Sequence, residues 1–184
     1  MKHKSIVVLL LFVTTTITAQ SKYFTKSGHT AFKASVEAFE AVEAKNKSTT
    51  AVLNTETGAI AALLFVKAFH FEIALMEEHF NENYMDSDKF PKVTFKGNIE
   101  SFNVDELSST AKEFIINGTL NIRGIDKEVE VKTMLSKNDK GAIILNGSFS
   151  VNPQDFDIKI PKIVRKKIAE TINIELNYEL VQKK

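Results

Sequence analysis

Apolar and polar residues alternate along most of the chain after residue 20. In the clearest case, residues 172–180, every second residue is apolar and the residues between are polar. Strict alternation predicts a β-strand with one buried and one solvated face. The same pattern predicts about eight antiparallel strands. They fall within residues 32–38, 49–53, 59–66, 93–95, 116–122, 129–135, 143–151 and 172–180.

Turn-forming residues separate several of these strands. Residues 54–58 (Asn-Thr-Glu-Thr-Gly) and 138–141 (Asn-Asp-Lys-Gly) predict hairpins, and residues 123–127 predict a third. Two Asn-Gly pairs, at 117–118 and 146–147, lie inside strand patterns. They are predicted to be bulges or bends.

Two segments break the alternation and predict short helices. In residues 72–84, apolar side chains recur at helical spacing between glutamates. In residues 161–170, Pro161 suits a first helical turn, and Ile163, Val164 and Ile168 recur at three to five residues.

The apolar face of a sheet of eight strands must be buried against another apolar surface, and the chain offers no second amphipathic layer to cover it. Closing the sheet on itself buries every apolar face and removes the edges. We therefore expect an all-β fold with two short helices, an antiparallel eight-stranded barrel. No linker or repeat divides residues 20–184, which predicts a single domain.

Composition narrows the function classes. With 24 Lys and Arg against 23 Asp and Glu, the chain has no excess charge to attract nucleic acid, so no nucleic-acid partner is expected. The absence of Cys excludes a disulfide scaffold and a thiol nucleophile.

The first 19 residues predict a secretory signal peptide. Lys2 and Lys4 precede an apolar run over residues 6–13, and Ala19 stands before the expected cleavage site. The run is far shorter than the roughly 20 residues that span a bilayer. We therefore expect an exported protein, periplasmic or extracellular, that is soluble after cleavage.

The motifs of common catalytic and metal sites are missing from the sequence. It contains no Gly-x-Ser-x-Gly, His-Glu-x-x-His or glycine-rich phosphate loop, so we expect no catalytic residues, no metal and no cofactor. The best metal candidates, His70, Glu72 and His79, match no common zinc spacing. An enzyme acting on a lipid remains an alternative, with His70, His79 and Tyr178 as its polar groups.

Fourteen Phe and no Trp form an unusual aromatic set, and several Phe fall on predicted strands. They would line an apolar cavity or fill a solid core, and the residue pattern alone leaves both open. A filled core would favour a structural or stress-related interaction module.

Two segments carry a family resemblance. Residues 74–97, above all Asp86-x-Asp88-Lys89-Phe90-Pro91-x-x-x-Phe95, and residues 118–124 closely resemble the YceI-like family of exported proteins. Residues 146–156 depart from the runs that many relatives carry there. The resemblance implies a lipocalin-like barrel whose interior holds a long amphiphile, a polyprenyl chain or a prenyl quinone, and it makes a homodimer plausible.

The expected function is thus a non-catalytic carrier with the hydrocarbon tail of its ligand inside the barrel and the polar head at the mouth, near residues 85–90. Lys162, Arg165, Lys166 and Lys167 offer a transient contact with an anionic membrane surface. The candidate interior residues are Phe32, Phe65, Phe69, Phe71, Leu75, Met76, Phe80, Phe95, Leu120, Ile122, Phe149, Ile174, Leu176 and Tyr178.

Overall fold

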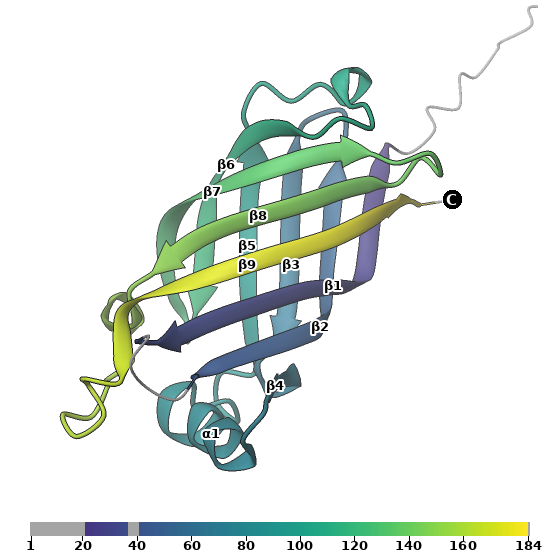
Figure 1. The fold of residues 1–184 in the computed structure, drawn as a ribbon. Coiled ribbons are helices and arrows are strands. Elements are labelled where there is room, and N and C mark those ends of the chain that lie inside the picture. The colour runs from purple at the N-terminus through teal and green to yellow at the C-terminus, as the bar shows by residue number, and fades with distance from the viewer. Residues whose placement is uncertain (1–20, 37–40, 184) are drawn as a thin grey trace, which may run out of the picture.

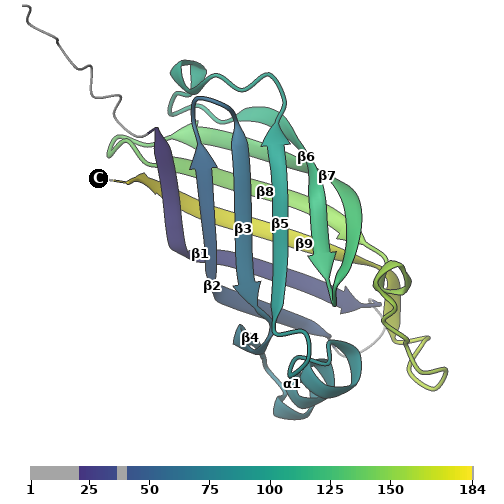
Figure 2. The ribbon, with the colours of Figure 1, turned by 180° about the vertical axis from the view of Figure 1, so that it is seen from behind.

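The chain forms a closed antiparallel β-barrel (Figures 1 and 2). The computed structural model describes residues 21–36 and 41–183; the predicted signal peptide lies outside them. Eight strands follow one another around the barrel in chain order, and β1 closes it by pairing with both β2 and β9. A ninth, three-residue strand, β4, pairs with β2 beyond the end of β3. The strands are β1 (Lys22–Ser35), β2 (Glu43–Asn54), β3 (Ala59–Phe65), β4 (Phe69–Phe71), β5 (Lys92–Ile99), β6 (Lys112–Ile122), β7 (Ile125–Lys137), β8 (Ile143–Val151) and β9 (Ile168–Gln182).

All three predicted hairpins are confirmed. The turn at Arg123 and Gly124 is the tightest, because Ile122 pairs directly with Ile125. Both turn residues have positive φ, 53° and 78°, the conformation that a two-residue hairpin requires and that glycine adopts without strain.

The two Asn-Gly pairs inside strands are not bulges, which corrects the prediction. Pairing runs without a register shift through Gly118 in β6 and Gly147 in β8. Glycine serves a different purpose at Gly118, which pairs with Gly97 of β5: a Cβ atom on either residue would lie 2.7 Å from the Phe95 ring. The bare backbone of this glycine pair thus makes room for an inward-lying phenyl ring.

The first predicted helix is present and the second is not. Residues 74–84 form α1 (Ala74–His79) and a π-helical turn (Phe80–Tyr84). Residues 161–167 form consecutive turns instead, and residues 168–170 belong to β9. Seven residues that include two β-branched side chains and a run of cations are too few to stabilise an isolated helix. The remaining helical elements are 3-10 turns at Val66–Ala68, Val104–Glu106 and Pro153–Phe156.

The two ends of the barrel differ. At one end, hereafter the α1 end, lie residues 66–91 with α1 and residues 152–167. The opposite end holds a tightly packed core in which Leu53, Leu135, Ile143 and Leu180 are completely buried. The barrel is therefore filled at one end, and its functional space lies toward the other.

Candidate ligand cavity

The α1 half of the barrel encloses a cavity of about 430 Å³. Strand β9 shows where it begins, because its inward-facing residues change from full burial at Leu180 and Tyr178 to partial exposure at Leu176 and Ile174. The cavity reaches the surface at the α1 end, where the exposed residues His79 and Lys167 line it. We refer to this opening as the mouth.

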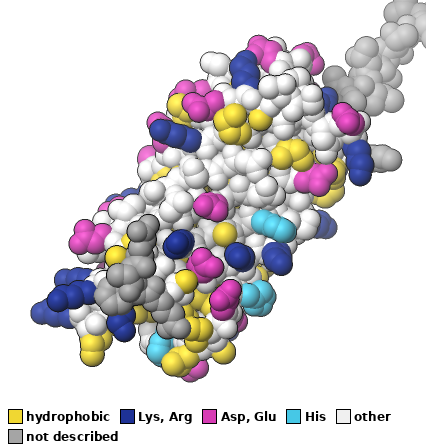
Figure 3. Space-filling view, in the orientation of Figure 1, with side chains coloured by type: hydrophobic (Ala, Val, Ile, Leu, Met, Phe, Trp, Pro, Cys, Tyr) yellow, Lys and Arg dark blue, Asp and Glu magenta, His cyan; other side chains and the backbone are white. Residues whose placement is uncertain are grey.

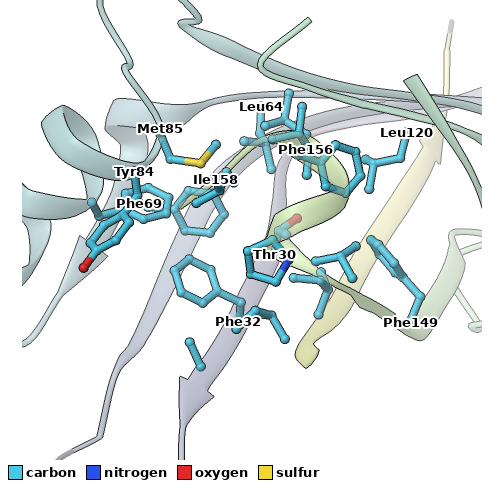
Figure 4. A pocket seen from close by; sticks show the side chains of 18 of the residues that line it. Thr30, Phe32, Leu64, Phe69, Tyr84, Met85, Leu120, Phe149, Phe156 and Ile158 are labelled. Carbon is cyan, nitrogen blue, oxygen red and sulfur yellow. The ribbon is translucent and has the colours of Figure 1, made fainter. Parts of the chain in front are cut away.

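The walls of the cavity are almost entirely apolar. Figure 4 shows Phe32 and Phe69 on one side and Leu120 and Phe149 on the other, all directed into the same space. Such a surface binds hydrocarbon, because each apolar group that leaves water on binding gains free energy.

Four phenylalanines form a cluster near the mouth. The Phe32 ring of β1 lies 5.3 Å from that of Phe69, 5.8 Å from that of Phe71 and 5.4 Å from that of Phe80, between ring centroids. Phe80 also contacts Phe69 and Phe71, at 5.7 and 5.2 Å. Aromatic pairs at these distances attract one another, so the cluster holds β4 and the helical segment against the barrel wall.

Residues 152–167 close the other side of the mouth. Their apolar side chains Pro153, Phe156, Ile158, Ile160 and Val164 line the cavity, and Phe156 is buried. The base of this segment is tied to the β6–β7 hairpin, because Arg123 Nη1 donates a 2.6 Å hydrogen bond to the Asp157 carbonyl.

A small polar site lies at the inner end of the cavity. Thr30 of β1, Thr49 of β2 and Tyr178 of β9 line it and are all buried. The Thr30 hydroxyl hydrogen-bonds to the Thr49 hydroxyl at 2.9 Å and to the Tyr178 hydroxyl at 3.0 Å. We call these residues the hydroxyl trio. Burial raises the pKa of the Tyr178 phenol, and the Thr30 and Thr49 hydroxyls act in the opposite direction.

The structure places twelve of the fourteen candidate interior residues on the cavity wall. They are Phe32, Phe69, Phe71, Met76, Phe80, Phe95, Leu120, Ile122, Phe149, Ile174, Leu176 and Tyr178.

Phe65 and Leu75 lie outside the cavity, which corrects their expected interior position. Phe65 is 50% exposed because its neighbours Leu64 and Val66 occupy the inward positions. Its ring lies 5.5 Å from Lys92 Nζ on the outer surface. Leu75 is 56% exposed, because the face of α1 that lines the cavity carries Met76 and His79.

Sequence reasoning missed two parts of the wall. Thr30 and Thr49 are polar residues at inward positions, which a search for apolar alternation passes over. Ile158 and Ile160 were not assigned to any element, although their spacing of two was a usable signal.

The polar groups of the alternative enzyme site do not converge. His70 is exposed on β4, where its Nδ1 lies 3.6 Å from Glu77 Oε2, and it does not line the cavity. His79 lies at the mouth and Tyr178 at the inner end. Within residues 21–36 and 41–183, no three His, Asp or Glu side chains come together as a metal site would require.

A closed antiparallel barrel with an apolar cavity at one end defines a lipocalin-like barrel, the architecture of proteins that hold one small ligand. The model of one family, the YceI-like domain, matches residues 13–180, and the chain belongs to this family. No curated protein matches the chain. In the part of the chain that the structure describes, no helix is long and apolar enough to cross a membrane.

Solved structures share the fold at low sequence identity. A polyisoprenoid-binding domain from Saccharophagus degradans, implicated in plant cell wall breakdown, has a TM-score of 0.75 at 8% identity, over 89% of this chain and 99% of that one. BcnA from Burkholderia cenocepacia has a TM-score of 0.67 at 15% identity, over 84% and 96%. The YCEI protein of Campylobacter jejuni has a TM-score of 0.54 at 16% identity, over the full length of both chains.

Proposed function

We propose that the protein is a non-catalytic carrier that holds a long isoprenoid-type amphiphile, a polyprenyl compound or a prenyl quinone, inside its barrel. The observation that carries the proposal is the apolar cavity of about 430 Å³ within a closed barrel. Its size falls in the range of small-molecule sites. The similarity to a polyisoprenoid-binding domain supports an isoprenoid as the ligand.

The energetics favour a hydrocarbon chain. Burial contributes about 0.8 kcal/mol per methylene, or roughly 4 kcal/mol per five-carbon isoprene unit, before the cost of ordering the ligand. Two or three units in contact with the phenyl rings and aliphatic walls are enough for tight binding. The cavity also argues against the filled core that a purely structural module would have.

The arrangement of polar groups supports binding rather than catalysis. Acid–base or nucleophilic catalysis needs a reactive group and its partner within hydrogen-bonding distance of one reacting atom. Here the Tyr178 phenol contacts threonine hydroxyls, while the histidine of the mouth, His79, lies at the other end of the cavity.

We place the protein outside the cytoplasm, in the periplasm or the extracellular space. The proposal rests on the signal-like pattern of residues 1–19. A carrier there would shield a water-insoluble ligand between membranes. The homodimer that the family resemblance implies stays a prediction, which light scattering of the purified protein tests.

A basic loop at the mouth is the proposed contact with an anionic membrane surface. Lys162, Arg165, Lys166 and Lys167 are exposed around Ile163, which is 89% exposed. Cations attract anionic lipid headgroups, and an exposed isoleucine among them inserts favourably into the interface. Val164 and Lys167 of the same loop line the cavity, so docking here would bring the mouth to the lipid.

Native mass spectrometry of the protein purified from an exporting bacterial host, followed by solvent extraction, tests the carrier function. We expect one apolar ligand per chain, with a mass built from isoprene units. Ile174→Glu, which places a charge on the cavity wall, should abolish binding, whereas Asn173→Glu on the solvated face of the same strand should not. Circular dichroism checks that both variants fold. A folded protein that stays empty after incubation with prenyl quinones would refute the proposal.

A further inference from the structure

The hydroxyl trio is a buried polar part of the cavity wall. Thr30, Thr49 and Tyr178 are 5%, 1% and 4% exposed and come from three neighbouring strands, β1, β2 and β9. Figure 4 shows Thr30 among the side chains that line the cavity, whose wall also carries the phenyl rings of Phe32 and Phe149. Polar groups buried in such a place cost free energy unless they are hydrogen-bonded.

The trio retains hydrogen-bonding capacity for a ligand. Its three hydroxyls carry three protons, and the two hydrogen bonds that join them use two. A hydroxyl proton rotates about its C–O bond, so the third can turn toward an acceptor in the cavity. The trio can therefore donate a hydrogen bond to a ligand oxygen at low cost.

The backbone is shaped to hold the phenol at this position. Strand β1 shifts its register against β2 on both sides of Gly28, and a Cβ atom there would lie 2.6 Å from Cδ1 of Tyr178. The Tyr178 ring thus lies against bare backbone, and its hydroxyl is directed to Thr30.

The charges on the cavity wall restrict what the trio can bind. Among the described residues that line the cavity, the cationic candidates are His79 and Lys167, both at the mouth. Lys167 directly precedes β9, and Tyr178 lies ten residues after the first residue of that strand, about 33 Å of extended chain. A phosphate or carboxylate at the inner end would be buried without a counter-ion, which is costly.

The geometry points to the hydroxyl trio as a site for an uncharged carbonyl-type oxygen of the ligand. The inference rests on the proposed function. It orients the ligand with its neutral polar group at the inner end and its hydrocarbon toward the mouth, the reverse of the orientation expected from sequence. Ligands of this class are isoprenoid quinones, ketones, esters and amides rather than prenyl phosphates.

A competition experiment tests the site. Farnesylacetone, an isoprenoid ketone, and its analogue with a methylene in place of the carbonyl are mixed in equal amounts with the protein, and native mass spectrometry measures the ratio of the two complexes. One additional hydrogen bond predicts that the protein prefers the ketone by about five- to tenfold. Any single substitution leaves two hydroxyls with one proton to spare, so the test variant removes all three. Thr30→Val, Thr49→Val and Tyr178→Phe together should reduce the ratio to about one and remove the low-frequency shift of the bound carbonyl stretch in the infrared.

Tyr84→Phe is the matched control, because it makes the same chemical change at the mouth end of the same cavity. It should leave the ratio unchanged. The inference is overturned if the native protein binds both probes equally, if the triple variant keeps the preference, or if Tyr84→Phe removes it. Should the triple variant fail to fold, the infrared spectrum of the native complex decides, and an unshifted carbonyl stretch of the bound ketone overturns the inference. If the native protein binds neither probe, the proposed function itself fails.

Discussion

The ring of Tyr178 lies against the backbone of Gly28, at the register shift of β1. The close approach leaves no room for a side chain, since a Cβ atom at Gly28 would also lie 2.9 Å from Cε1 of Tyr178. Strands β9 and β1 pair with each other where the barrel closes, so this contact lies both at the closure of the barrel and at the inner end of the cavity.

Replacing Gly28 by alanine should therefore destabilise the protein. The new methyl group must displace the Tyr178 ring, and overpacking of this kind costs about 1–3 kcal/mol. Urea unfolding measures the loss. Ser27→Ala, at the exposed neighbouring residue, is the control and should change the free energy of unfolding by less than about 0.5 kcal/mol. Equal stability of the two variants would contradict the packing described.

The raised pKa of Tyr178 predicts a loss of stability in alkali. The buried phenol stays protonated in the folded protein at pH values at which it ionises in the unfolded chain. Its contribution is therefore fully present below its ordinary pKa of 10.0 and declines above it, by about 1.4 kcal/mol per pH unit until the folded pKa is reached.

Tyr178→Phe removes this titration. The difference in unfolding free energy between the native protein and the variant, measured in urea from pH 8 to 11, should be constant below pH 10 and should shift in favour of the variant above it. A difference that is independent of pH would show that the phenol is not desolvated.

Phe80 should control how firmly the mouth is closed. Its ring contacts Phe32, Phe69 and Phe71, and each aromatic pair is worth about 0.5–1.5 kcal/mol beyond burial. Phe80→Ala should weaken binding of an isoprenoid by roughly tenfold or more, mainly through faster dissociation. Stopped-flow displacement of a bound prenyl quinone measures the rate.

Leu75→Ala provides the comparison for Phe80→Ala. Leu75 lies on α1, directly before the π-helical turn that carries Phe80, but it is exposed and does not line the cavity, so its truncation should leave the dissociation rate unchanged. Equal dissociation rates in the two variants would show that the aromatic cluster does not control the closure of the mouth.

Charge reversal in the basic loop should weaken binding to anionic membranes. Each cation near the surface contributes about 1 kcal/mol, so Lys162→Glu combined with Lys166→Glu should reduce binding to phosphatidylserine-containing vesicles by at least about thirtyfold at low salt. Lys137→Glu combined with Lys140→Glu makes the same charge change at the opposite end of the barrel. Vesicle sedimentation measures the bound fraction of each variant. Figure 3 shows charged side chains spread over one face of the molecule. An equal loss of binding in both double variants would therefore indicate general electrostatic attraction rather than docking by the mouth.

Much of the fold follows from alternation along the strands. Residues 172–180 show it without interruption, and hairpin residues such as Asn54 and Gly124 mark where strands end. The site was harder to predict, because a continuous apolar run such as residues 59–66 does not reveal whether its odd-numbered or its even-numbered residues face the interior. Phe65 was misplaced for this reason. Thr30 and Thr49 were missed because their inward position depends on the closure of β1 against β2, a contact between strands.

The uneven filling of the barrel separates two requirements that usually compete, a well-packed core for stability and an open cavity for a ligand. Side chains such as Leu53 and Leu180 concentrate the stabilising contacts at the filled end, which allows the α1 half to remain hollow. We therefore expect substitutions at wall positions such as Ile174 to change the proposed ligand preference more than they change the stability of the fold. In this protein the filled half would then preserve the barrel while the hollow half acquires a new specificity.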